Sequence, residues 1–195
     1  MNTSDAQTWA IAILVLVALI AVGWLLTRQR NSRRLADRFG PEYRRVVAER
    51  GDRAKAEAEL RAREKRVQRF KIEALSPAEA ARFGDQWREL QAHFVDNPRA
   101  VVSDADALVR ELMAKRGYPM ADFERQAADI SVDHPALVEN YRAAHATGVL
   151  NERGEASTEQ LRRALVYYRD LFAELLEVRD SRPASPPERH SQVQS

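Results

Sequence analysis

Residues 9–26, WAIAILVLVALIAVGWLL, form an uncharged and almost entirely apolar stretch near the start of this chain. In an α-helix that rises 1.5 Å per residue, this stretch would be about 27 Å long, close to the ~30 Å hydrocarbon core of a bilayer. Trp9 and Trp24 fall near its two ends, where an indole ring can stay in the apolar layer while its N–H group reaches the headgroups. The sequence therefore predicts a membrane-spanning helix with interface anchors, preceded by a short extracytoplasmic segment, residues 1–8.

Basic residues follow the predicted span closely, whereas none precedes it. Arg28, Arg30, Arg33 and Arg34 all lie within the first turns after residue 26. Because Lys and Arg beside a span tend to stay in the cytoplasm, we expect the N-terminus outside a bacterial inner membrane and the body of the chain in the cytoplasm. A cleaved signal peptide is disfavoured, since the first eight residues carry no positive charge. A buried helix of a soluble protein, the other alternative, is seldom apolar on every side in so short a chain.

The net charge of +2 conceals a basic segment followed by an acidic one. Residues 28–71 contain 16 basic and 7 acidic residues, whereas residues 72–195 contain 15 basic and 21 acidic residues. The basic segment is expected to contact lipid headgroups near the span or to pair its charges within a helix. A nucleic-acid contact is disfavoured, because acids are interleaved with the arginines and stacking aromatic residues are lacking. The absence of cysteine excludes disulfides and thiolate chemistry.

Residues 27–75 contain strong helix formers but few apolar positions. The helix that begins in the span is expected to end at Gly40. Beyond it, a helix that is polar nearly all round either bridges solvent or is held by ion pairs four residues apart, such as Glu57 with Arg61. We predict an extended, charged helical arm that contributes nothing to a core, with a bend or break at Gly51.

Helix start and stop signals divide residues 76–179 into a compact bundle of about five helices. The signals are the capping-box patterns SPAE at residue 76 and STEQ at residue 157, the pairs Asn97-Pro98 and Asp133-His134-Pro135, and the stops Gly117 and Gly148. The strongest apolar stripe comes last, at Leu161, Leu165, Tyr168, Phe172 and Leu175. No segment alternates like a strand, so the predicted fold class is all-α. Residues 180–195, with three prolines and no apolar periodicity, are expected to be a disordered tail.

Three runs in the body of the chain carry a resemblance: WRELQAHFVDNPRAVVSDADALV, RGYPMADFERQAADISVDHPALVENYR and STEQLRRALVYYRDLFAELL. Together with the earlier FGPEY, they resemble a family of bacterial single-span membrane proteins with an all-helical soluble domain. The resemblance covers residues 39–176. It carries no assigned activity, and no catalytic residue follows from it.

Four ionisable residues are the candidates for a polar site: His93, Asp129, Asp133 and His134. Imidazole and carboxylate groups can bind a divalent metal or act as an acid–base pair. The spacing matches neither HExxH nor a calcium loop, and no two histidines lie four residues apart. The simpler interpretations are a helix N-cap for Asp133 and a buried histidine with a backbone partner for His93.

These observations favour a membrane-anchored binding or scaffold protein over an enzyme. The sequence contains neither a glycine-rich phosphate loop nor a nucleophile-elbow serine, and no cofactor is expected. The expected partners are membrane lipid and either another protein or a second copy, whose acidic head would attract the basic arm. Two alternatives stay open: a membrane-anchored metal-binding or hydrolytic helical bundle with a site around Asp129, Asp133 and His134, and a membrane tether for nucleic acid.

Overall fold

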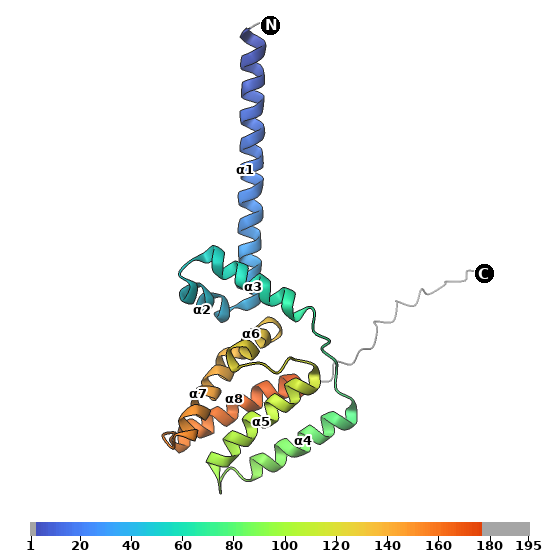
Figure 1. Cartoon of the computed structure of the whole chain (residues 1–195), viewed down its shortest axis with the longest axis vertical. Helices are drawn as coiled ribbons and strands as arrows, with labels where there is room; N and C mark the ends of the chain where they lie inside the picture. The colour runs from blue at the N-terminus through green and yellow to red at the C-terminus, as the bar shows by residue number, and fades with distance from the viewer. Residues whose placement is uncertain (1–2, 177–195) are drawn as a thin grey trace, which may run out of the picture.

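The computed structural model describes the backbone of residues 3–176 and the side chains of residues 16, 19–23 and 26–176. Within residues 3–176 the chain forms eight α-helices and no β-strand, which confirms the predicted all-α class. A long helix, α1 (Thr3–Phe39), projects away from the other seven, which gather at its C-terminal end (Figure 1). No helix in the described part of the chain is both long enough and apolar enough to cross a membrane. The predicted tail, residues 180–195, lies outside the described residues.

The predicted arm is folded into a small helical unit with its own core. The last turns of α1 pack against α2 (Pro41–Arg50) and α3 (Arg53–Val67), and we call this part, residues 32–67, the neck unit. Its core consists of Leu35, Phe39, Tyr43, Val46, Ala56, Leu60 and Val67, completed by Val132 from the bundle. The prediction of an extended arm without a core is therefore wrong, because three thin apolar stripes share one small core.

Two glycines reverse the chain within the neck unit. Gly40 follows α1 with φ 49°, and Gly51 follows α2 in the left-handed region with φ 63°, a conformation that residues with a Cβ adopt at a cost. Asp52 then caps α3, its side chain accepting a hydrogen bond from the Lys55 backbone N–H at 2.8 Å. The predicted helix end at Gly40 and the predicted break at Gly51 are both confirmed.

Five helices form the bundle, as the sequence predicts. They are α4 (Pro77–Ala92), α5 (Pro98–Arg116), α6 (Phe123–Asp133), α7 (Val138–Glu152) and α8 (Thr158–Leu176). Helix α8 makes its most extensive contacts with α5 and α7, and α4 packs mainly on α5. Because α8 carries the strongest apolar stripe, its residues supply much of the bundle core, including a Phe172 ring stacked on Trp87 at 4.6 Å. In Figure 1 the neck unit lies between the projecting part of α1 and this bundle.

Most of the predicted helix ends in the bundle are confirmed. Both bonds of the capping box form at Ser76 and again at Ser157, Asn97 caps α5, and Gly117 ends α5 in the left-handed region. Helix α7 differs, since it runs past Gly148 to Glu152. Gly148 therefore lies inside α7 and is not a helix stop, and a Cβ at this position would make an ordinary contact with the Tyr168 hydroxyl at 3.8 Å.

Replacing Gly117 by alanine is expected to destabilise the fold by about 2 kcal/mol or more. Its φ of 94° already disfavours a side chain by about 1 kcal/mol, and an added Cβ would meet the Lys71 carbonyl oxygen at 2.2 Å. Gly51 is the matched control, because it also ends a helix at positive φ but has open space around a Cβ. Gly51→Ala should cost only about 1 kcal/mol in thermal or urea unfolding. Equal losses in the two variants would contradict the close approach of residue 71 to α5.

Candidate functional site

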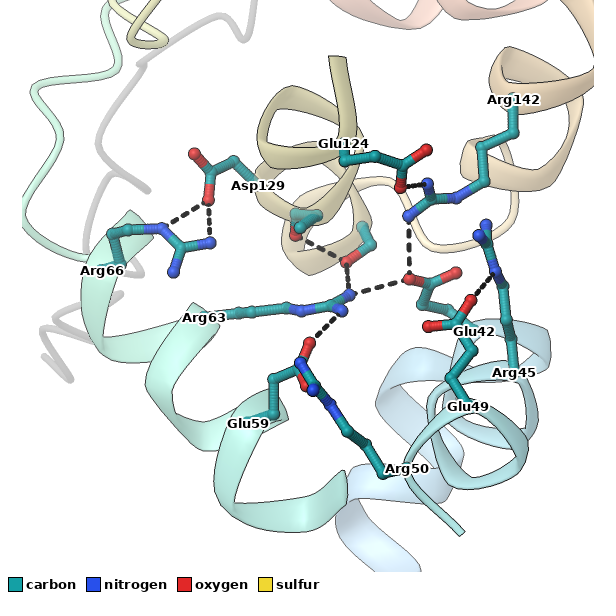
Figure 2. Close-up of polar contacts among 12 residues, drawn as sticks. Glu42, Arg45, Glu49, Arg50, Glu59, Arg63, Arg66, Glu124, Asp129 and Arg142 are labelled. Atoms are coloured by element: carbon teal, nitrogen blue, oxygen red, sulfur yellow. Dashed lines mark hydrogen bonds and ion pairs between the residues drawn. The ribbon is translucent and has the colours of Figure 1, made fainter. Parts of the chain in front are cut away.

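A network of arginines and carboxylates joins the neck unit to the bundle (Figure 2). At its centre is Glu42 of α2, with a side chain only 1% exposed. Its Oε1 accepts hydrogen bonds from Arg63 of α3 at 2.7 Å and from Arg142 of α7 at 3.2 Å. The same two guanidinium groups each hold a second carboxylate at 2.5 Å, Glu59 for Arg63 and Glu124 for Arg142. One buried carboxylate thus fixes α2, α3 and α7 to one another.

A second ion pair extends the network toward α6. Arg66 of α3 contacts Asp129 Oδ1 with Nε at 2.7 Å and with Nη2 at 2.5 Å, and the Asp129 side chain is buried. Nearby, Arg63 also reaches the Ser131 hydroxyl at 3.4 Å, which in turn donates to the Ala128 carbonyl at 2.7 Å. A buried charge is stable only when it is paired, so the contacts of Arg63 and Arg66 tie α3 to α6.

The charges of this network balance one another. Four carboxylates, from Glu42, Glu59, Glu124 and Asp129, face four guanidinium groups, from Arg50, Arg63, Arg66 and Arg142. Burial would raise the pKa of Glu59, but its bonds to Arg50 and Arg63 outweigh burial and hold this pKa below its ordinary value. A cleft of about 480 Å³ opens beside these residues, and most of the charged side chains on its walls pair with one another. The network is therefore built as a joint between helices.

A second buried carboxylate, Glu57 of α3, holds the neck unit together near the end of α1. Glu57 Oε1 accepts hydrogen bonds from Ser32 at 2.6 Å, from Tyr43 at 3.0 Å and from Arg53 at 3.0 Å. Burial would raise the pKa of Glu57, and these three donors outweigh it, so the pKa lies below its ordinary value. Burial and the neighbouring Glu57 both raise the pKa of Tyr43. The carboxylate thus stays charged and crosslinks α1, α2 and α3.

Two clefts open where α3 crosses α1, and both include Arg28 in their walls. The first has a volume of about 380 Å³ and is lined by Arg28, Gln29, Ser32, Arg53 and Glu57. The second has a volume of about 430 Å³ and is lined by Thr27, Arg28, Asn31, Ala54, Glu57 and Arg61. We call these two hollows the Arg28 clefts. Guanidinium donors on their walls suit an oxyanion ligand.

The predicted interface residues lie on α1 ahead of the neck unit. Arg28, Arg30, Arg33 and Arg34 are all exposed, and Arg28 is the one that lines the clefts. The positions of Trp9 and Trp24 fall within α1, but their side chains lie outside the described residues. All four arginines thus lie at the surface of α1.

Three of the four polar-site candidates have different partners. Asp129 is buried against Arg66, whereas Asp133 is exposed and accepts a hydrogen bond from the Tyr118 hydroxyl at 3.0 Å. His134 Nδ1 lies 3.3 Å from a carboxylate oxygen of Glu174 on α8. No group of three or more potential metal ligands occurs among the side chains that the structure describes.

Two of the simpler interpretations of these residues are wrong. Asp133 is the last residue of α6 and not an N-cap, since α7 begins only at Val138 without a side-chain cap. His93 follows the last residue of α4 and is exposed, so it is not a buried histidine.

The sequence reasoning missed the residues at the centre of the joint, although a local signal for them exists. Arg63 lies on the same helical stripe as Leu60 and Val67, and Glu42 adjoins Tyr43 on the inward face of α2. A charge at an inward position of an otherwise apolar stripe predicts a buried ion pair. The sequence alone cannot say which distant residue is its partner.

Comparison of the chain with models of protein families, with curated protein sequences and with solved structures gives no match. The resemblance to bacterial single-span membrane proteins therefore stays a prediction from the quoted runs. Any functional argument must therefore start from two features of the structure. One is the ion-pair network around Glu42, which fixes the neck unit to the bundle, and the other is the pair of Arg28 clefts beside α1.

Proposed function

We propose that this chain is a single-pass inner-membrane protein whose cytoplasmic helical body acts as a rigid binding or scaffold module. The uncharged residues 9–26 support the anchor. Further support comes from the described apolar side chains of α1 in this stretch, which are between 50% and 64% exposed: Leu16, Leu19, Ile20, Val22 and Leu26. In water such a helix would leave a large apolar surface uncovered, whereas a bilayer would cover it.

The continuity of α1 carries this proposal. The helix runs without interruption from Thr3 to Phe39, so the apolar stretch and the first wall of the neck unit are one rod. Glu57 fixes α3 to this rod through Ser32, and Glu42 fixes the neck unit to α7 through Arg142. A body joined in this way has a defined orientation and distance relative to its anchor. This is what a module needs if it presents a binding face to a partner near the membrane.

The orientation is tested by protease protection of a C-terminal tag on the full chain. The exposed arginines after residue 26 support a cytoplasmic body. The tag should be protected in right-side-out vesicles and cut in inverted ones. The opposite pattern would place the body on the outer side and overturn the proposed orientation.

The anchor itself is tested with a pair of charged variants. Leu16→Arg/Ile20→Arg puts two charges near the middle of residues 9–26, and each should cost about 3 kcal/mol of insertion free energy. This variant should no longer resist extraction by alkaline carbonate. Leu26→Arg/Gln29→Arg adds the same charge at the end of the stretch, where long side chains reach the headgroups, and should stay in the membrane. Equal resistance of both variants would contradict a membrane-spanning α1.

A further inference from the structure

The Arg28 clefts lie at a defined depth relative to the proposed anchor. Their walls on α1 come from residues 27–32, one to six residues after Leu26, which corresponds to about 1.5–9 Å along the helix axis. The headgroup layer of a bilayer is about 5–7 Å thick on each side of the hydrocarbon core. The clefts therefore open within or just beneath the layer in which lipid phosphates lie.

Arginines from two helices converge on these clefts. Arg28 comes from α1, while Arg53 and Arg61 come from α3 and keep 64% and 47% of their side chains exposed. The one acid on the walls is Glu57, whose Oε1 accepts hydrogen bonds from Ser32, Tyr43 and Arg53. Its Oε2 lies 4.0 Å from a guanidinium nitrogen of Arg61. Three arginines thus share these walls with a single carboxylate, so positive charges outnumber negative ones there.

We propose that the Arg28 clefts bind the phosphate groups of anionic phospholipids in the cytoplasmic leaflet, an inference that rests on the membrane anchoring proposed above. The Ser32–Glu57 bond at 2.6 Å holds α3 across α1 before any lipid binds, so the two walls of each cleft are already in place. Guanidinium groups bind phosphate through paired N–H donors, and their attraction to anionic lipid acts within a Debye length of the surface. Two lipids beside α1 would thereby brace the neck unit against the membrane.

The test measures lipid selectivity of the full chain in phosphatidylcholine vesicles, with spin-labelled phosphatidylglycerol and spin-labelled phosphatidylcholine as probes. The unaltered chain should immobilise phosphatidylglycerol preferentially, and the preference should fall as salt rises. The Arg53→Gln/Arg61→Gln variant should reduce the relative association constant for phosphatidylglycerol by at least about fivefold, roughly the effect of one basic residue near the surface. Both residues lie too far along the chain from the span to influence its orientation, and Arg28 is kept.

The matched control is Arg88→Gln/Arg162→Gln in the bundle. These arginines are 75% and 58% exposed, and each pairs with an acid three residues away, so the control removes the same charge from similar surroundings. The control should keep the lipid preference and the melting temperature of the unaltered chain. Equal loss in both variants, or no loss in either, would overturn the assignment to the clefts.

Two further measurements distinguish lipid binding from the binding of a soluble phosphate and from failure of the membrane anchor. Inorganic phosphate, added at matched ionic strength and at no more than the concentration of accessible phosphatidylglycerol, should leave the preference largely unchanged, because the bilayer holds the lipid beside the clefts. Loss of the preference at this concentration would mean that the clefts select a soluble phosphate, and the lipid assignment would be wrong. Flotation of the same vesicles after alkaline carbonate treatment tests the anchor separately. A chain that floats without lipid preference refutes only the clefts, whereas a chain that does not float refutes the anchor and the clefts together.

Discussion

Replacing Glu42 by alanine is expected to destabilise the fold by about 3 kcal/mol, through the loss of one buried carboxylate that Arg63 and Arg142 share. Removing one partner of a buried ion pair costs about 3–5 kcal/mol, because the remaining charge is left uncompensated. Arg63 and Arg142 each retain a second carboxylate at 2.5 Å, so we expect the lower end of this range. Thermal or urea unfolding of the full chain in detergent measures the loss.

Glu49→Ala on the same helix is the matched control. Glu49 pairs with Arg45 at 2.7 Å across one helical turn, but its side chain is 49% exposed. Exposed pairs four residues apart contribute only about 0.3–0.5 kcal/mol, so this variant should unfold almost as the unaltered chain does. If Glu42→Ala and Glu49→Ala have equal effects, the network is a surface feature and does not fix the neck unit to the bundle.

Local signals were sufficient wherever the decisive contacts are close in sequence. The capping boxes at Ser76 and Ser157 join residues three positions apart, and the chain reversal at Gly51 depends on a single backbone conformation. Such contacts form within one turn, so their residue types alone predict them. The all-α class and the five bundle helices follow from these signals together with the apolar stripes.

The neck unit was not predictable in the same way, because its stability is shared among segments. The apolar stripe on each of its helices is too narrow to form a core without the others. The sequence does not show how many of these stripes pack together. Its central ion pairs join Glu42 to residues 21 and 100 positions away. Partners at such separations are chosen by packing geometry, which a single sequence does not contain. For the same reason the sequence singles out Asp129 as a polar-site candidate but does not identify Arg66 as its partner.

Replacing Phe172 by alanine is expected to cost about 3–5 kcal/mol, the second large effect in this chain. Phe172 lies on α8, is only 3% exposed, and stacks on Trp87 with ring centroids 4.6 Å apart. Truncation removes the transfer free energy of the ring, leaves a cavity and breaks an aromatic pair. Tyr167→Ala is the control, since Tyr167 is half-buried on the same helix and should cost clearly less. Losses of similar size in both variants would argue against a core centred on α8.

The same variant tests how the two cores are coupled. Phe172 belongs to the bundle core and Leu60 to the neck core, and the Glu42 network lies between them. With the network intact, Phe172→Ala should lower the protection of α3 amides in hydrogen exchange together with that of α8, because both cores open as one unit. In a Glu42→Ala background, Phe172→Ala should lower the protection of the α8 amides while leaving the protection of the α3 amides nearly unchanged. If the α3 amides respond equally in both backgrounds, apolar contacts such as Val132 on the neck core hold the units together, and the rigid scaffold does not depend on the buried charges.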